Sequence, residues 1–345
     1  MATRQIISKN INIASGTYVG RDGELWVDTA SNVLKISDGS TAGGVTITTD
    51  GGGALTWAAI TNINNAEGPD KIAVGTLAGS TSQGVNTVAI GNSAGKGSQG
   101  GSAVAVGYHA GLVSQGGIAV AVGTFAGKTN QAGNAVAVGN LAGETSQGVS
   151  ATAVGDTAGS ISQEIYATAI GVGAGSVTQR TKAVAIGLNA AFTNQGASAI
   201  AIGDEAGKTN QSGDAIGIGT DAGKTTQGGY AVAIGRTAGQ ISQSAGAVAI
   251  GSGAGYTTQG ISGIAIGYLA GESGQGASAI AIGSNAGTSN QAANSIVINA
   301  TGATLQNTSA SRFIVKPVRA VAGSLPSGFK QMAYNPTTGE IISYG

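Results

Sequence analysis

The sequence lacks several residue types on which common functions depend. It has no cysteine, which excludes a disulfide framework and a thiolate metal site. Its one histidine, His109, excludes a metal centre built from clustered histidines. Charged residues make up only 9% of the chain and the formal net charge is zero, so no basic surface for nucleic acid is indicated. Aromatic residues make up 4%, so a hydrophobic core has to be built from small side chains.

Long apolar runs are also missing. No stretch approaches the ~18 consecutive apolar residues of a transmembrane helix. The first twenty residues hold no apolar segment of the kind found in secretory signals. We therefore expect a product made in a cytoplasm, without membrane insertion and without export by the Sec pathway.

Proline is absent from residues 70–316 and present on both sides of them. Because proline lacks the N–H that a central strand donates, this distribution separates a strand-rich middle from two different ends. We divide the chain into an N-terminal β module (1–50), a glycine-rich connector and cap (51–71), a repeat shaft (72–302) and a C-terminal cap or tip (303–345).

Both end regions contain hairpin patterns. Segments 24–28 and 33–37 alternate in character around the loop 29–32. Near the C-terminus, residues 334–341 carry the turn signals of a second hairpin. We therefore expect small β modules at both ends of the chain.

The middle of the chain repeats every sixteen residues. A glycine keeps this period from Gly75 to Gly283, and an alanine keeps it from Ala78 to Ala286, without an insertion. Such internal repeats indicate stacked units, because a unit held between two neighbours cannot change its length. A glutamine keeps the same period at Gln83, Gln99, Gln115, Gln131, Gln147, Gln163, Gln179, Gln195, Gln211, Gln227, Gln243, Gln259, Gln275 and Gln291.

One repeat, residues 103–118, predicts two short strands and two turns. Residues 103–106 alternate alanine with valine, Gly107 and Gly111 permit a turn with positive φ, and a second strand ends at Gln115. Each unit is then one coil of a parallel β-roll, or β-solenoid, and the fold class is all-β. About fourteen coils spaced ~4.8 Å apart predict a rod of roughly 67 Å.

The two faces of the first strand predict how the coils are buried. Valine and isoleucine share one face, which we assign to the inside of the coil. The other face carries a column that is alanine in 11 of 13 units from position 87 to position 279. A solvent-exposed column would be expected to hold polar residues in many repeats. We therefore assign these alanines, Ala199 and Ala231 among them, to a contact between subunits of a homotrimer. We expect the stacked glutamines to form an internal amide ladder.

The repeats resemble a known family. The segment 198–203, Ser-Ala-Ile-Ala-Ile-Gly, is similar to the repeats of YadA-type trimeric adhesin heads, and the resemblance covers roughly residues 72–298. It implies a left-handed parallel β-roll that associates as a homotrimer. Residues 20–44 resemble the N-terminal module of many phage fibre proteins. The repeats together with the ending 334–340 are similar to fibre-like proteins of phages and large DNA viruses.

These resemblances imply a structural fibre protein of the virion, on the tail or the head, whose trimeric shaft contributes to host-surface attachment. The expected partners are a baseplate, tail or capsid protein, bound through the N-terminal region, and a glycan or protein of the host surface. We expect no enzymatic activity, no cofactor and no nucleic-acid partner. Two alternatives stay open. A bacterial trimeric adhesin head would need an export signal and an anchor, and a polysaccharide-cleaving tailspike enzyme would need convergent carboxylates in a groove.

One cluster of acidic residues is a candidate for a catalytic or cation-binding site. Glu205 and Asp221 occupy the same position in adjacent units, so their Cα atoms should lie roughly 5 Å apart, with Asp204 beside them. That separation suits the carboxylate pair of a retaining glycosidase or a cation site, and equally a solvated surface cluster. These three residues are the only candidate metal ligands. The receptor-binding residues are not identified by the sequence.

Two further sequence patterns give only weak evidence for a binding site. Ala-Gly-Lys-Thr occurs at 126–129, 206–209 and 222–225 and resembles the end of a phosphate-binding loop, but the glycine spacing of that loop is absent. Exposed aromatic side chains are candidates for stacking on glycans, but they fall in several columns and define no patch. They are Tyr108, Phe125, Tyr166, Phe192, Tyr230, Tyr256 and Tyr268.

Overall fold

The computed structural model describes residues 70–318 in full, together with Ser40 and the backbone of five further strands. The chain divides into two compact units, residues 1–61 and 62–345. Most of the predicted regions 1–50 and 51–71, and much of 303–345, therefore lie outside the described residues. No helix able to cross a membrane occurs in the described ranges.

Short antiparallel strands occur near both ends of the chain. In the first unit β1 (Leu25–Asp28) pairs with β2 (Val33–Ile36), and β3 (Val45–Thr46) joins the free edge of β2. In the second unit β31 (Gln331–Tyr334) pairs with β32 (Ile341–Tyr344). Both predicted hairpins are confirmed.

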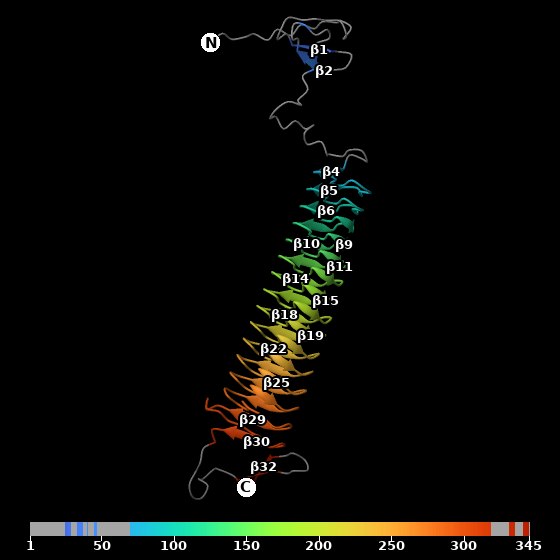
Figure 1. Ribbon diagram of the computed structural model, residues 1–345. Coiled ribbons are helices and arrows are strands. Elements are labelled where there is room, and N and C mark those ends of the chain that lie inside the picture. Colours follow the sequence, from blue (N-terminus) through green and yellow to red (C-terminus); the bar gives the residue numbers. More distant parts are fainter. Residues whose placement is uncertain are drawn as a thin grey trace, which may run out of the picture. The chain divides into compact units, whose positions relative to one another are not determined.

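The repeats form a β-solenoid of two parallel sheets, seen in Figure 1 as a stack of coils from β4 to β30. Every coil contributes a strand to a 16-stranded sheet, and most coils contribute a second strand to an 11-stranded sheet. From β4 to β29 each strand pairs with the equivalent strand sixteen residues away, as Val136 pairs with Thr152. The predicted fold class and period are confirmed.

The 16-stranded sheet consists, in spatial order, of β4 (Lys71–Val74), β5 (Thr87–Ile90), β6 (Val104–Val106), β8 (Val120–Val122), β10 (Val136–Val138), β12 (Thr152–Val154), β14 (Thr168–Ile170), β16 (Val184–Ile186), β18 (Ile200–Ile202), β20 (Ile216–Ile218), β22 (Val232–Ile234), β24 (Val248–Ile250), β26 (Ile264–Ile266), β28 (Ile280–Ile282), β29 (Ile296–Asn299) and β30 (Phe313–Lys316). The last pairing, β29 with β30, joins Ile296 to Phe313. The stack of strands thus continues past residue 302, into the segment predicted to be a cap.

The 11-stranded sheet consists of β7 (Val113–Gln115), β9 (Thr129–Gln131), β11 (Thr145–Gln147), β13 (Ile161–Gln163), β15 (Val177–Gln179), β17 (Thr193–Gln195), β19 (Thr209–Gln211), β21 (Thr225–Gln227), β23 (Ile241–Gln243), β25 (Thr257–Gln259) and β27 (Ser273–Gln275). All its pairings are parallel. For example, Gln147 of β11 is in register with Gln163 of β13.

The periodic glycines are required by the tight stacking of the turns. Gly123 has φ of 132°, and a Cβ atom there would lie 2.4 Å from the carbonyl oxygen of Gly139 in the next coil. Gly127 has φ of 52°, and its Cβ would lie 2.7 Å from the side-chain amide carbon of Gln131. A larger residue would therefore meet either the next backbone or the buried glutamine, besides adopting an unfavourable φ, and in the Gly127 column only Ala191 departs from glycine between Gly79 and Gly287, with φ of 47°.

The interior of each coil is filled by alanine from one sheet and glutamine from the other. Ala103, Ala105 and Ala110 are fully buried within the single chain, and Gln115 is 2% exposed. The Gln115 amide nitrogen crosses the interior and donates to the carbonyl oxygen of Val104, at 2.9 Å. Because a glutamine side chain already spans the gap, only a methyl group fits on the facing strand.

The predicted assignment of the strand faces is therefore wrong. Alanines such as Ala199 and Ala231 lie inside the coil and are 0% exposed without any partner subunit. The valines and isoleucines of the same strands point outward, where Ile202 keeps 36% of its surface exposed. A glutamate at Ala199 or Ala231 would therefore place its charge in the core of the coil and not in a contact between subunits.

The predicted glutamine ladder is confirmed. From Gln83 to Gln291 each side-chain amide nitrogen donates to the amide oxygen of the next glutamine, at 2.9 to 3.1 Å. Hydroxyl groups complete both ends of the ladder. Thr87 donates to the Gln83 oxygen, and the Gln291 nitrogen donates to the Ser295 hydroxyl oxygen, each at 3.2 Å. Both hydroxyls occupy the column that is mostly alanine, so the two hydroxyl residues of that column mark the two ends of the ladder.

Truncating one glutamine of the ladder should destabilise the solenoid strongly. Gln227→Ala removes the acceptor of Gln211, the donor of Gln243 and a bond to the carbonyl oxygen of Ile216, and it leaves a cavity. We expect a loss of about 3 to 5 kcal/mol, measured as a lower midpoint of urea unfolding. Gln240→Ala makes the same change outside the ladder and should shift stability by less than about 0.5 kcal/mol. Equal midpoints for the two variants would mean that the ladder contributes nothing.

Candidate functional site

The most extensive surface feature is an apolar strip on the 16-stranded sheet. The outward residues of β5 to β28 are β-branched in every coil, and all but two are valine or isoleucine. Ile202, Ile218 and Ile234 are each 36% exposed, so the strip is partly covered by its own neighbours and partly open. We call it the Val/Ile face: Val88, Ile90, Val104, Val106, Val120, Val122, Val136, Val138, Thr152, Val154, Thr168, Ile170, Val184, Ile186, Ile200, Ile202, Ile216, Ile218, Val232, Ile234, Val248, Ile250, Ile264, Ile266, Ile280 and Ile282.

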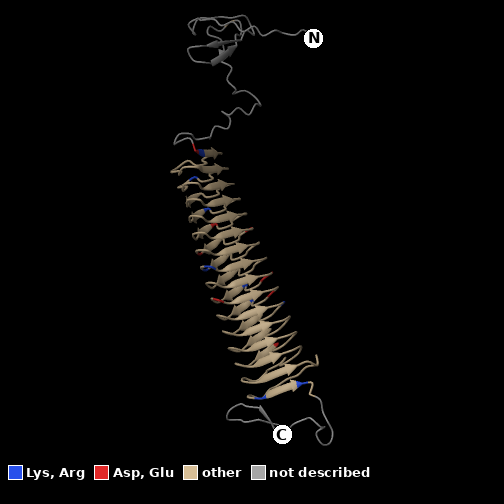
Figure 2. Cartoon of the chain, turned by 180° about the vertical axis from the view of Figure 1, so that it is seen from behind, with Lys and Arg blue, Asp and Glu red and all other residues tan. Residues whose placement is uncertain are grey.

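Charged residues avoid the Val/Ile face and are sparse elsewhere. Figure 2 shows lysine, arginine and acidic residues scattered along the stack, with no continuous band of either sign. Contiguous apolar surface of this extent is rare on soluble monomers and marks an interaction site. The Val/Ile face is therefore the leading candidate for a functional surface.

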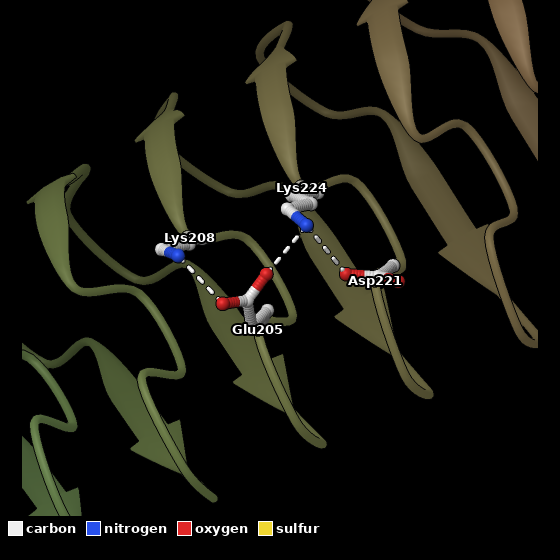
Figure 3. Close-up of polar contacts among 4 residues, drawn as sticks. All are labelled: Glu205, Lys208, Asp221 and Lys224. Atoms are coloured by element: carbon white, nitrogen blue, oxygen red, sulfur yellow. Dashed lines mark hydrogen bonds and ion pairs between the residues drawn. The ribbon is translucent and has the colours of Figure 1, made fainter.

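The acidic spot identified in the sequence is part of a cluster with two lysines (Figure 3). The two carboxylate oxygens of Glu205 accept from different lysines, Lys208 and Lys224, each at 2.5 Å. Lys224 also pairs with Asp221 at 2.9 Å. Glu205 and Asp221 lie in adjacent coils as predicted, because the Asp221 amide donates to the carbonyl oxygen of Asp204.

The cluster shifts two pKa values. Hydrogen bonds from Lys208 and then Lys224 lower the pKa of Glu205 below its ordinary 4.5. Hydrogen bonds to Glu205 and then Asp221 raise the pKa of Lys224. Both shifts favour the charged forms. Among residues 70–318 and the other described positions, no group of three or more histidine and acidic residues is placed to hold a metal ion.

The arrangement differs from a hydrolytic carboxylate pair. A glycosidase acid must carry a proton near neutral pH, which calls for a raised pKa, whereas the pKa of Glu205 is lowered. The lysines of the three Ala-Gly-Lys-Thr segments are all used in ion pairs: Lys128 with Glu144, Lys208 with Glu205, and Lys224 with both acids. The sequence placed Glu205 and Asp221 in adjacent coils, but the part played by Lys208 and Lys224 was missed, although each of these lysines follows an acid by three residues.

Neutralising the shared lysine should cause a small, pH-dependent loss of stability. Lys224→Met keeps the aliphatic stem and removes the charge that joins Glu205 to Asp221. At about pH 7 we expect a loss of about 0.5 to 1 kcal/mol, since the side chains are 24 to 31% exposed. A carboxylate whose folded pKa is lowered stabilises the fold above its ordinary pKa and loses that effect as the pH falls through the folded value. The difference should therefore shrink towards about pH 3, measured by urea unfolding.

Lys96→Met is the matched control for this change, because Lys96 occupies the same column and no ion pair of it occurs in the described residues. Its unfolding midpoint should follow that of the unmodified protein at both pH values. A difference between Lys224→Met and the unmodified protein that stays constant with pH would contradict the assignment.

Two of the scattered aromatic residues come together with the histidine. The rings of Tyr108 and His109 stack with centroids 3.9 Å apart, and the Phe125 ring meets both edge-on at 5.3 and 5.4 Å. The Lys128 ammonium lies 4.8 Å from the Phe125 centroid. His109 and Phe125 share a column sixteen residues apart, which was the signal for their contact. These geometries are typical of stabilising aromatic and cation–π contacts.

Comparison of the chain with protein-family models, with curated proteins and with solved structures found no match.

Proposed function

We propose that the chain is a structural fibre protein of a virus particle, and that its solenoid is the shaft of a homotrimer. The observation that carries the proposal is the Val/Ile face. It runs over the strands from β5 to β28, and in the single chain it is left open, with Ile202 and Ile218 each 36% exposed.

The regularity of this face indicates its partner. Its side chains recur once per coil at the strand spacing of ~4.8 Å, so a complementary surface must have the same period over the same length. A second copy of this chain, aligned side by side, has that period by construction. Closed association around a threefold axis lets every copy cover its face, and it leaves no face free for open-ended growth.

The ends of the chain supply attachment in this proposal. The resemblance of residues 20–44 to fibre modules supports docking of the N-terminal region to a tail, baseplate or capsid protein. The C-terminal residues 303–345 then form the distal end, towards the host surface. The role is mechanical rather than catalytic, and the protein resides in the virion.

The mass of the purified protein in solution tests the trimer. Analytical ultracentrifugation should give three times the mass of one chain, with no dissociation on dilution to low micromolar concentration. A folded monomer at those concentrations would contradict the proposed trimer, because the chain would then be stable with its Val/Ile face exposed to water.

Terminal labels test the fibre. Gold labels fused separately to each end should appear on virus particles by electron microscopy, with the N-terminal label at the particle and the C-terminal label at the free end. Labels found on a bacterial envelope instead would favour the adhesin-head alternative, which shares the trimer.

A further inference from the structure

Two adjacent coils depart from the repeat at the turn that follows the buried glutamine. The residue after that glutamine is glycine, alanine or serine in every other coil, but it is Glu164 and Arg180 in these two. Two positions later the same coils carry Tyr166 and Lys182, in a column that has positive φ in every coil from Asn86 to Asn294. The backbone of this turn is therefore regular, and the departure lies in the charged side chains of Glu164 and Arg180.

A surface groove adjoins this place. It has a volume of about 510 Å³ and crosses three consecutive coils, over the ends of β17 and β19 and the turns that follow them, from Arg180 past Asn194 to Asn210 and Ser212. Two coil spacings correspond to ~9.6 Å, the length of a short stretch of polymer. None of its lining residues belongs to the 16-stranded sheet, so the groove does not compete with the Val/Ile face. A second groove, of about 350 Å³, lies on the preceding coils and includes Glu164 and Thr181.

Some polar groups along the first groove keep donor or acceptor atoms that could meet a ligand. The side chain of Arg180 is exposed, and no hydrogen bond or ion pair of its guanidinium occurs within residues 70–318. Asn194 donates to the Asn210 amide oxygen at 3.1 Å, which fixes both side chains and leaves the Asn194 oxygen and the Asn210 nitrogen for a ligand. The neighbouring carboxylate of Glu164 is already occupied, since the Thr181 amide and hydroxyl donate to its Oε2 at 2.9 and 2.8 Å.

We infer that this groove binds a sugar chain that carries a carboxylate, with Arg180 as the carboxylate ligand. A guanidinium presents two parallel N–H donors that match a carboxylate, which a lysine cannot do. The Asn194 and Asn210 amides and the Ser212 hydroxyl offer the mixed donors and acceptors that sugar hydroxyls require. The open, shallow form suits a chain lying along the shaft. The inference rests on the proposed function, because it gives the fibre a contact with host-surface glycans.

Isothermal titration of the full-length protein with oligogalacturonate tests the inference, and the fully methyl-esterified oligomer is the matched neutral probe. The acid should bind and the ester should bind at least about tenfold more weakly, as expected for loss of a charged hydrogen bond. Arg180→Gly, which restores the residue found in most coils, should weaken binding of the acid by at least about tenfold. Arg180→Lys should recover only part of that loss.

Arg236→Ala is the control, because it removes one exposed arginine from a different turn and should leave the affinity unchanged. Equal affinity for acid and ester, or equal loss with Arg180→Gly and Arg236→Ala, overturns the inference. So does the absence of binding to both oligogalacturonate and sialyllactose at millimolar concentration. Sedimentation of Arg180→Gly is measured in parallel, so that a failure of the trimer is distinguished from a failure of the sugar site.

Discussion

Replacing Ala201 with glutamate is expected to unfold the coils around it. Ala201 is 0% exposed and lies between the two sheets, where the buried glutamines leave room for no more than a methyl group. The variant would place a larger, charged side chain there without a partner, and such changes cost more than about 4 kcal/mol. Loss of the β-sheet circular dichroism signal and rapid proteolysis within the repeats would be the measured result. A well-folded variant would show that the interior is wider than the structure has it.

The neighbouring substitution should have the opposite effect. Ile202 follows Ala201 in β18 and points outward from the Val/Ile face. Ile202→Glu together with Ile218→Glu should leave each chain folded, because the charges remain in water, and should convert the proposed trimer to monomers. Buried like charges on three copies around one axis have no compensating partners. The readouts are a retained circular dichroism spectrum and a threefold drop in sedimenting mass.

Thr209→Glu with Thr225→Glu is the matched control on the 11-stranded sheet, because it adds the same charge to the other outer surface. It should leave the mass unchanged. Dissociation by the threonine pair and not by the isoleucine pair would move the subunit contact to the 11-stranded sheet.

The sequence was sufficient for the architecture, because the sixteen-residue period admits few folds. Strand positions, turns and the amide ladder follow from the spacing of Gly107, Gly111 and Gln115. The orientation of the first strand could not be predicted from that spacing. The alternation of alanine with valine or isoleucine shows that the two faces of the strand differ, but it does not show which face lies inside the coil. The usual preference for branched side chains in a core gave the wrong answer here. The width of the coil is set by Gln115 reaching across it, and that is a property of both sheets together.

A signal for the correct orientation was nevertheless present. The outward columns accept Thr152 and Thr168, whereas the two inward columns between residues 87 and 295 depart from alanine only at Thr87, Ser295 and two glycines. Tolerance of a hydroxyl in mid-shaft indicates partial exposure. The acidic cluster was predicted only in part. The lysine partners of Glu205 come from two coils, so their positions depend on how the coils stack and not on one repeat alone.

The stacking of the coils also determines how the shaft would respond to pulling. The hydrogen bonds between coils, backbone and glutamine alike, run along the direction in which the coils are stacked. A tensile load on the chain ends therefore opens the bonds of the terminal coil one after another instead of shearing many at once. Each released coil lengthens from one spacing of ~4.8 Å to as much as roughly 55 Å of extended chain. A fibre of this construction would yield stepwise and absorb work, and re-form coil by coil when the load is removed.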